Sequence, residues 1–232
     1  MAGRGVGIPL RALLAVSGRL YLGTSGFSYP TWKPGFYPAG TPQREFLRSY
    51  AEHFNSVELN TTGYRLPDEE RFRHWAEETP DGFRFAVKMP HPNRLGAFTE
   101  RCSALGKKLG PVRIVVQQAR DDVFFARLLD SLDPALHWAF DFRHASWVGV
   151  ETARAAVVDA LDGDAPFRYL RFREPPYDEA SLRDWADRLR PVLADGIEVY
   201  AYFKHEDEPT APGYARRLLE LLAANNQDRG AS

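Results

Sequence analysis

Hydrophobic residues make up 44% of the 232-residue chain, charged residues make up 26%, and the formal net charge is -1. This balance excludes a strongly basic nucleic-acid-binding protein and an acidic disordered chain, so any anion-binding site must be local. The length fits one α/β barrel domain. The single cysteine, Cys102, excludes an internal disulfide and a cysteine-rich metal site, and we expect it to be a small packed side chain.

We predict three regions: a flexible N-terminal extension at 1–18, a single barrel domain at 19–225 and a frayed tail at 226–232. The apolar run from Leu10 to Val16 is interrupted by Arg11, and no clear cleavage pattern follows it, so it makes a poor signal peptide. No segment approaches the roughly 18 consecutive apolar residues that a membrane span needs. Together with the low cysteine content, these features favour a cytoplasmic protein with no membrane partner.

Taken in order, the chain alternates short apolar strands with segments at helical spacing. The predicted strands cover 20–26, 56–60, 83–89, 112–118, 137–143, 167–173 and 196–204. The predicted helices cover 41–54, 68–78, a weaker segment ending at 108, 121–131, 151–161, 178–193 and 214–225. Repeated strand-helix units imply a parallel sheet, and we predict that it closes into a TIM-type (β/α) barrel of the α/β class.

Polar residues gather at the carboxyl ends of these strands, on the side opposite the apolar parity. On the strand 137–143, Asp141 and Arg143 share one side; on 112–118 the even positions are apolar, which leaves Gln117 as the polar residue at the end. A barrel accounts for this pattern if the apolar parity packs on the helices and the polar parity points into the lumen. The predicted lumen residues are Glu58, Asn60, Lys88, Gln117, Asp141, Arg143, Arg171, Arg173, Tyr202 and Lys204. Active sites of such barrels lie at this end.

Six sequence blocks in order carry a resemblance to a known family. They are Gly23-Thr24-Ser25-Gly26-Phe27-Ser28-Tyr29 with Trp32, Val57-Glu58-Leu59-Asn60 with Tyr64 and Pro67, Phe85-Ala86-Val87-Lys88, Lys108-Leu109-Gly110-Pro111, Phe142-Arg143-His144-Ala145-Ser146-Trp147, and Tyr200-Ala201-Tyr202-Phe203-Lys204. Together these blocks resemble the YecE-like family, domain of unknown function 72. The resemblance implies a TIM-type barrel but supplies no agreed reaction.

The chain departs from the family pattern in two places. Only 19 residues separate Trp147 from Phe167, so the sixth βα unit is shortened or missing, with Val157-Val158-Asp159 as its remnant. We therefore expect a gapped or seven-stranded barrel. The family often has a glutamine-leucine-proline-proline run after the fourth strand, and here the run is Gln117-Gln118-Ala119-Arg120, so this loop is expected to differ.

Our first functional hypothesis is an enzyme that acts on a phosphorylated or otherwise anionic, sugar- or nucleotide-like substrate. Arginine suits bidentate contacts to oxyanions, and we assign Glu58 or Asp141 as general base and His144 as acid. The predicted substrate-binding residues are Asn60, Tyr64, Lys88, Gln117, Arg143, Trp147, Arg171, Tyr202 and Lys204. The competing interpretation is an internal ion-pair network without a ligand, because such networks also occupy non-catalytic interiors.

Two further alternatives stay open. A metal-dependent phosphoesterase or endonuclease-like hydrolase would draw its ligands from Glu58, Asp141, His144, His91, His205 and Glu206. No local ligand spacing supports it, and nearby arginine and lysine repel a cation, so we assign no metal ligand and leave the cofactor unknown. A non-catalytic nucleic-acid or ligand-binding barrel would use the aromatic residues Tyr29, Trp32, Phe36, Tyr64 and Trp147. The near-zero net charge disfavours nucleic acid.

Overall fold

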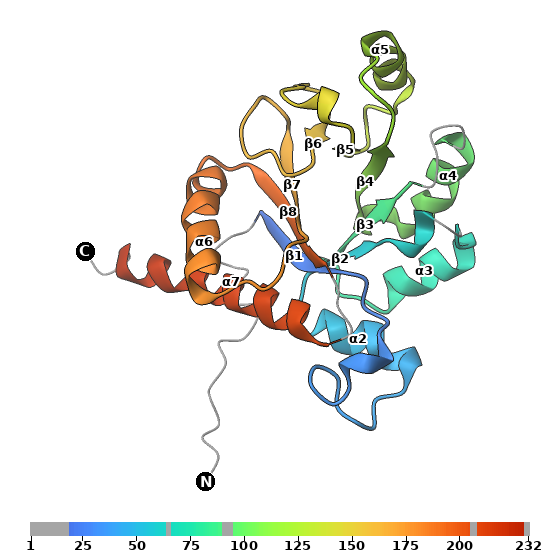
Figure 1. The fold of residues 1–232 in the computed structure, drawn as a ribbon. Coiled ribbons are helices and arrows are strands. Elements are labelled where there is room, and N and C mark those ends of the chain that lie inside the picture. Colours follow the sequence, from blue (N-terminus) through green and yellow to red (C-terminus); the bar gives the residue numbers. More distant parts are fainter. Residues whose placement is uncertain (1–18, 64–65, 90–94, 205–207, 230–232) are drawn as a thin grey trace.

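The computed structural model describes residues 19–63, 66–89, 95–204 and 208–229. Parallel strands form one sheet in the order β6-β5-β4-β3-β2-β1-β8-β7, with helices packed around it (Figure 1). The strands are β1 (Leu20–Ser25), β2 (Ser56–Leu59), β3 (Arg84–Lys88), β4 (Leu109–Val116), β5 (Trp138–Phe142), β6 (Ala156–Val157), β7 (Phe167–Phe172) and β8 (Glu198–Lys204). The sheet is curled into a nearly closed barrel, so the predicted TIM-like α/β fold is confirmed.

The helices follow β1, β2, β3, β4, β7 and β8. They are α2 (Phe46–Ala51), α3 (Glu69–Glu77), α4 (Leu95–Cys102), α5 (Asp122–Ser131), α6 (Glu179–Ala194) and α7 (Thr210–Arg229). Three of them begin after an aspartate, Asp68, Asp121 or Asp178, whose carboxylate accepts a hydrogen bond from a backbone N–H of the first turn. Such caps satisfy donors that the helix itself leaves unpaired, which is why these helices begin where they do.

The apolar parity of each strand packs against the helices, as the alternation predicts. Val57 and Leu59 of β2 and Ile114 of β4 are almost fully buried in the same core as Phe72 of α3 and Leu182 of α6. The opposite parity points into the lumen. The buried lumen side therefore holds its own smaller core, separate from the layer between sheet and helices.

Aromatic rings fill the lumen below its charged end. Tyr21 stacks on Tyr200 with ring centroids 4.6 Å apart, and Phe167 packs edge-on against Tyr200 at 5.7 Å. Tyr169 and Tyr202 lie two residues further along β7 and β8, and their ring centroids are 5.5 Å apart. The lumen is thus packed rather than open, and the carboxyl ends of the strands are where barrels of this kind carry their sites.

The glycines of the first strand have steric reasons to be there. A Cβ on Gly23 would collide with the carbonyl oxygen of Ser56 and the hydroxyl of Tyr50. Gly26 has a φ of 91° and lies against the ring of Tyr29, so a side chain there is excluded twice. These contacts explain the glycine-bracketed turn without a ligand.

The predicted shortening of the sixth unit is confirmed, because β6 has only two residues. With β6 counted, the described sheet has eight strands, so of the two expected forms, gapped or seven-stranded, the seven-stranded one is wrong. The helix predicted at 151–161 is wrong: within the described chain no α-helix lies between β5 and β7, where the chain forms the 3-10 turn Ala145–Trp147, β6 and loop (Figure 1). The β-branched residue Val157 favours extended backbone, and it pairs with β5 as part of β6 together with the buried residue Ala156.

Asp159 connects β6 to β7, which share no strand ladder. Its backbone N–H donates to the carbonyl of Tyr169 at 2.8 Å, and its carboxylate accepts from the backbone N–H of Arg171 at 2.7 Å. Its φ is 70°, a left-handed conformation that aspartate tolerates better than most residues. The backbone N–H and the carboxylate of this one residue therefore replace part of the missing ladder at the seam of the barrel, where β6 and β7 face each other.

Candidate anion-binding site

Glu58 lies at the centre of the polar lumen and is fully buried. Its carboxylate accepts hydrogen bonds from the hydroxyl of Ser25, from Tyr169 at 2.7 Å and from Arg171 Nε at 3.1 Å. Arg113 Nε lies 2.8 Å from Glu58 Oε1 as an ion pair, although its N–H is not aligned for a hydrogen bond. Both carboxylate oxygens are occupied, so Glu58 organises the groups around it.

The same contacts set the pKa of Glu58. Burial alone would raise this pKa, but Arg113 and Arg171, together with the hydrogen bonds from Ser25 and Tyr169, lower it to about 2. Glu58 is therefore ionised at neutral pH. A carboxylate with so low a pKa is a weak proton acceptor, so the geometry favours a positioning role over the general-base role predicted for it.

Arg113 is the central residue that sequence reasoning missed. It lies on β4 with 2% of its side chain exposed, and its Nη1 donates to Asp141 Oδ2 at 2.6 Å while its Nη2 donates to Asn60 Oδ1 at 2.7 Å. With its ion pair to Glu58, it bridges the two buried carboxylates. The available signal was its parity, because Arg113 occupies an odd position, as does the predicted lumen residue Gln117 just beyond the end of β4.

Asp141 is shared by several guanidinium groups. It is 2% exposed, and in addition to Arg113 it accepts a hydrogen bond from Arg143 Nη2 at 2.8 Å. Arg173 Nη1 lies 3.5 Å and Arg171 Nη1 lies 3.8 Å from its oxygens. One carboxylate cannot fully neutralise four arginines, so positive charge remains at this end of the lumen.

Asp159 is the third carboxylate of the cluster. It pairs with Arg173 Nη2 and, unlike Glu58 and Asp141, it is partly accessible, with 39% of its side chain exposed. Its pKa lies above its ordinary value because burial outweighs the opposing effects of the Arg171 N–H and Arg173. Because 39% of its side chain is exposed, the Asp159 carboxylate can contact a ligand that enters from solvent.

The cluster as a whole carries more positive than negative groups. Four guanidinium groups, Arg113, Arg143, Arg171 and Arg173, face three carboxylates, Glu58, Asp141 and Asp159. The pKa of Arg143 lies below its ordinary value because of burial; Asp141 opposes this shift, while the neighbouring arginines add to it. The surplus of arginine is what an anion would neutralise.

A cavity of about 590 Å³ opens at the carboxyl end of β7. Arg143, Arg171, Arg173 and Asp159 line it, and Trp185 of α6 contributes an apolar wall. Arg143 is 42% exposed and Arg173 is 25% exposed, whereas Arg171 is only 9% exposed. An adjoining cavity of about 600 Å³ also has Arg143 and Asp159 in its lining. The arginine surplus therefore reaches solvent at this mouth.

Other predicted binding residues lie at different depths. Tyr202 is fully buried with its hydroxyl 2.7 Å from Ser56 Oγ, so it belongs to the packed lumen. Asn60 is half-buried, and its side-chain oxygen accepts a hydrogen bond from Arg113. Lys88 ends β3 half-buried and Lys204 ends β8 exposed, so the structure places both at the carboxyl ends of strands without bringing them into the described ion-pair cluster.

His144 lies outside the ion-pair cluster. It is exposed, and its Nδ1 is 2.9 Å from Ser146 Oγ in the 3-10 turn Ala145–Trp147. It nevertheless lines the 600 Å³ cavity together with Arg143 and Asp159. Its position suits proton exchange with a ligand in that cavity rather than contact with Glu58 or Asp141.

Trp147 and Gln117 lie outside the ion-pair cluster, although Trp147 is part of the lining of the 600 Å³ cavity. Trp147 is 2% exposed, stacks on Phe142 at 4.4 Å and donates its indole N–H to the carbonyl of Gln118 at 2.8 Å, so it packs the loop rather than meeting a ligand face-on. Gln117 is exposed just beyond β4. Tyr64 lies outside the described residues.

Within the described ranges, no group of three or more histidine, cysteine, aspartate or glutamate side chains is arranged to hold a metal ion. Arg113 fills the space between Glu58 and Asp141 with a positive group. The other ligands considered for a metal, His91, His205 and Glu206, lie outside the described residues. Cys102 is buried, which raises its pKa to about 12 and agrees with a packed side chain.

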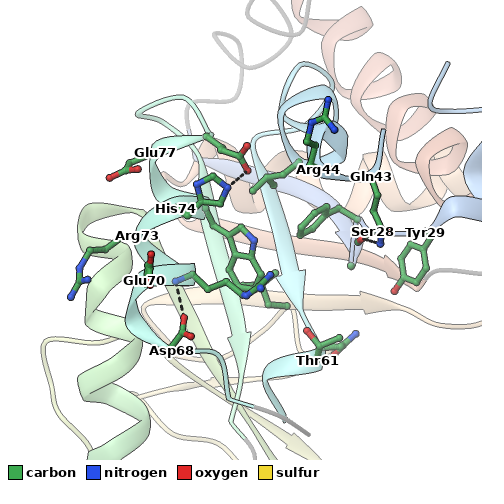
Figure 2. Close-up of a pocket in the computed structure, with 18 residues that line it drawn as sticks. Ser28, Tyr29, Gln43, Arg44, Thr61, Asp68, Glu70, Arg73, His74 and Glu77 are labelled. Carbon is green, nitrogen blue, oxygen red and sulfur yellow. Dashed lines mark hydrogen bonds and ion pairs between the residues drawn. The ribbon is translucent and has the colours of Figure 1, made fainter. Parts of the chain in front are cut away.

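A larger cavity, of about 1080 Å³, lies beside α3 and the segment after β1 (Figure 2). Its charged lining includes three arginines and four carboxylates: Arg44, Arg71, Arg73, Asp68, Glu70, Glu77 and Glu78. Helix α3 supplies most of these groups, and some pair locally, as His74 does with Glu78 at 3.5 Å. With carboxylates in the majority, this cavity is a poorer anion site than the mouth at β7.

These features define a (β/α)-barrel protein with an arginine-rich mouth at the carboxyl ends of its strands. The chain belongs to the family described as protein of unknown function DUF72, whose model matches residues 21–232. This match confirms the resemblance seen in the six sequence blocks. No helix in the described part of the chain combines the length and apolar character that crossing a membrane requires.

Individual relatives agree with this assignment. The chain is 32% identical over 139 residues to UPF0759 protein YecE of Escherichia coli K12, covering 54% of this chain and 48% of that protein. It is 32% identical over 69 residues to UPF0759 protein YunF of Bacillus subtilis 168, covering 30% of this chain and 23% of that protein. The chain therefore spans about half or less of the length of these relatives.

Solved structures give the same fold. A DUF72 family protein from Thermotoga maritima MSB8 superposes with a TM-score of 0.73 at 24% identity, covering 88% of this chain and 98% of that one. A DUF72 family protein from Enterococcus faecalis V583 superposes with a TM-score of 0.71 at 17% identity, covering 88% and 97%. At these identities the likeness establishes the architecture alone.

Proposed function

We propose that the mouth of the barrel binds a small phosphorylated or otherwise anionic ligand, sugar- or nucleotide-like, as the substrate of an enzymatic reaction. The observation that carries this proposal is the sharing of Asp141 by four arginines, three of which line one cavity. Planar guanidinium groups suit bidentate contacts to phosphate or carboxylate oxygens.

The buried and exposed arginines have different parts in this proposal. Arg113 is tied to Glu58, Asp141 and Asn60 and holds the lumen together. Arg143 and Arg173 are the accessible members and are the groups that would meet the ligand. This division preorganises the ligand site, because the buried pair with Arg113 fixes the Asp141 carboxylate, with which Arg143 and Arg173 form ion pairs.

Of the three residues predicted to act in catalysis, His144 is the best placed to transfer a proton. Glu58 and Asp141 are buried and occupied by arginines, whereas His144 is exposed beside Arg143 in the adjoining cavity. The two ring nitrogens of an imidazole allow it to act as a proton donor or a proton acceptor. We therefore keep His144 as the proposed acid and treat the two carboxylates as positioning groups.

The proposal is tested by titration calorimetry of the full chain with inorganic phosphate, a sugar phosphate and a nucleoside monophosphate. Arg173→Met should weaken binding by roughly tenfold or more, because a charge-assisted hydrogen bond is lost. The matched control is Arg190→Met, since Arg190 is 27% exposed and also pairs with an aspartate, Asp187, but lies on α6 away from the cavity. Absence of binding to the parent chain, or equal loss in both variants, would overturn the proposal.

A further inference from the structure

We propose that Asp159 makes the mouth selective for anions that still carry a proton or a hydroxyl group, such as hydrogen phosphate or a phosphate ester beside a hydroxyl, over fully ionised anions such as sulfate. This inference rests on the proposed anion site and names the ligand chemistry that it selects. A carboxylate can accept a hydrogen bond from an O–H of the ligand but repels an oxygen that carries only negative charge.

The position of Asp159 supports this role. It is the accessible carboxylate of the cluster, with 39% of its side chain exposed against 2% for Asp141. It lines both cavities at the mouth, as Arg143 does. A ligand bound to Arg143 and Arg173 therefore lies next to a carboxylate oxygen.

Asp159 is held in place by two hydrogen bonds to the backbone of β7. The carboxylate Oδ1 accepts the Arg171 N–H at 2.7 Å, and the residue's own N–H donates to Tyr169 at 2.8 Å. The other oxygen, Oδ2, pairs with Arg173. Each carboxylate oxygen has a second acceptor site beyond these bonds, so an O–H of the ligand can be received without displacing Arg173.

The remaining charged groups around the cavity do not offer the same selectivity. Glu174 also lines the cavity, but among the described ion pairs its carboxylate joins none of the four arginines, whereas Asp159 pairs with Arg173. Asp141 contacts the arginines from within the lumen and is 2% exposed. Asp159 is thus the acceptor that a bound anion would face beside its arginine partners.

The test compares inorganic phosphate with sulfate at neutral pH, where phosphate keeps at least one proton and sulfate keeps none. Titration calorimetry of the full chain should show that phosphate binds roughly tenfold or more tightly than sulfate, as expected for one charge-assisted hydrogen bond gained and one repulsion avoided. Asp159→Asn should bring the two affinities close together, mainly by strengthening sulfate binding. Asparagine also tolerates the left-handed backbone and keeps an oxygen for the Arg171 N–H.

The control is Asp130→Asn, which removes an exposed carboxylate paired with Arg154 and should leave the ratio of affinities unchanged. Equal binding of phosphate and sulfate to the parent chain, or an unchanged ratio in Asp159→Asn, would overturn the inference while leaving the anion site intact. Binding of neither anion would overturn the anion site and the inference together. Circular dichroism of both variants verifies that the fold is retained.

Discussion

Arg113 and Asp141 lie on the neighbouring strands β4 and β5, and Arg113 Nη1 donates to Asp141 Oδ2 at 2.6 Å with each side chain 2% exposed. The pair is buried, and the same guanidinium also pairs with Glu58. Removing one partner from such a network leaves charges without compensation in a poorly solvated interior. The stability of the lumen therefore depends on Arg113 more than on any accessible arginine.

Arg113→Met should lower the free energy of unfolding by about 3–5 kcal/mol, because Glu58 and Asp141 lose their common partner. The measurement is urea denaturation followed by circular dichroism at neutral pH. Arg154→Met, which removes an exposed pair with Asp130, should cost less than about 1 kcal/mol. A loss for Arg113→Met no larger than that of the control would contradict the assignment.

Acid should destabilise the protein through Glu58. Its folded pKa of about 2 lies below its ordinary value of 4.5, so the unfolded chain binds the proton first. The stabilisation, on the order of 3 kcal/mol, is fully present above about pH 4.5 and is lost as the pH falls towards 2. Urea titrations between these values should show a steeper fall for the parent chain than for Glu58→Gln. If the free energy of unfolding fell equally steeply with decreasing pH in the two proteins, the assignment of this acid sensitivity to Glu58 would be wrong.

Tyr169→Phe tests the hydrogen bond of 2.7 Å to the Glu58 carboxylate. Both groups are fully buried, so losing the hydroxyl should cost about 1.5–3 kcal/mol and should also raise the pKa of Glu58. Thermal unfolding at neutral pH measures the first effect, and the pH dependence of stability measures the second. Tyr177→Phe is the control, because its hydroxyl accepts from the backbone N–H of the exposed residue Glu174. Comparable losses in the two variants would refute the special role of Tyr169.

Gly23→Ala should strongly destabilise the barrel, because the new methyl group would overlap the Ser56 carbonyl and the Tyr50 hydroxyl. Overpacking of this kind typically costs about 1–3 kcal/mol or more. Gly96→Ala on α4 is the control, since a Cβ added there would meet no neighbouring atom within 4 Å outside its own helix and alanine favours the helix. Unfolding temperatures that agree within error would show that β1 can shift to accept the methyl group.

Much of the fold could be predicted from alternation, because the period of two on each strand separates the helix-facing side from the lumen. The same rule predicted Glu58, Asp141 and Arg171 as lumen residues. Arg113 follows the same rule but is not among the predicted lumen residues, because the β-branched residues around it give this strand an apolar character. Strand parity was sufficient in principle, whereas the partners of each charge depend on contacts between distant strands.

The roles of individual aromatic and loop residues are harder to predict. Trp147, in the turn after β5, and Tyr202, on β8, are aromatic, as many ligand contacts are, yet Trp147 packs against Phe142 and the Tyr202 hydroxyl bonds to Ser56. Asp159 was recognised only as a remnant of the sixth unit. Its importance arises from its closeness to Arg171 and Arg173 across the seam, which no local pattern reports.

The seam between β6 and β7 also affects how readily copies of this chain could aggregate through their sheet edges. A sheet that is not fully closed has two edges, and exposed edges can recruit strands from other molecules into aggregates. Here one edge, β6, has only two residues, and the other, β7, is crossed by Asp159 through a backbone and a side-chain bond. Because β6 is so short and Asp159 occupies backbone groups of β7, few free backbone N–H and C=O groups remain with which a strand of another molecule could pair.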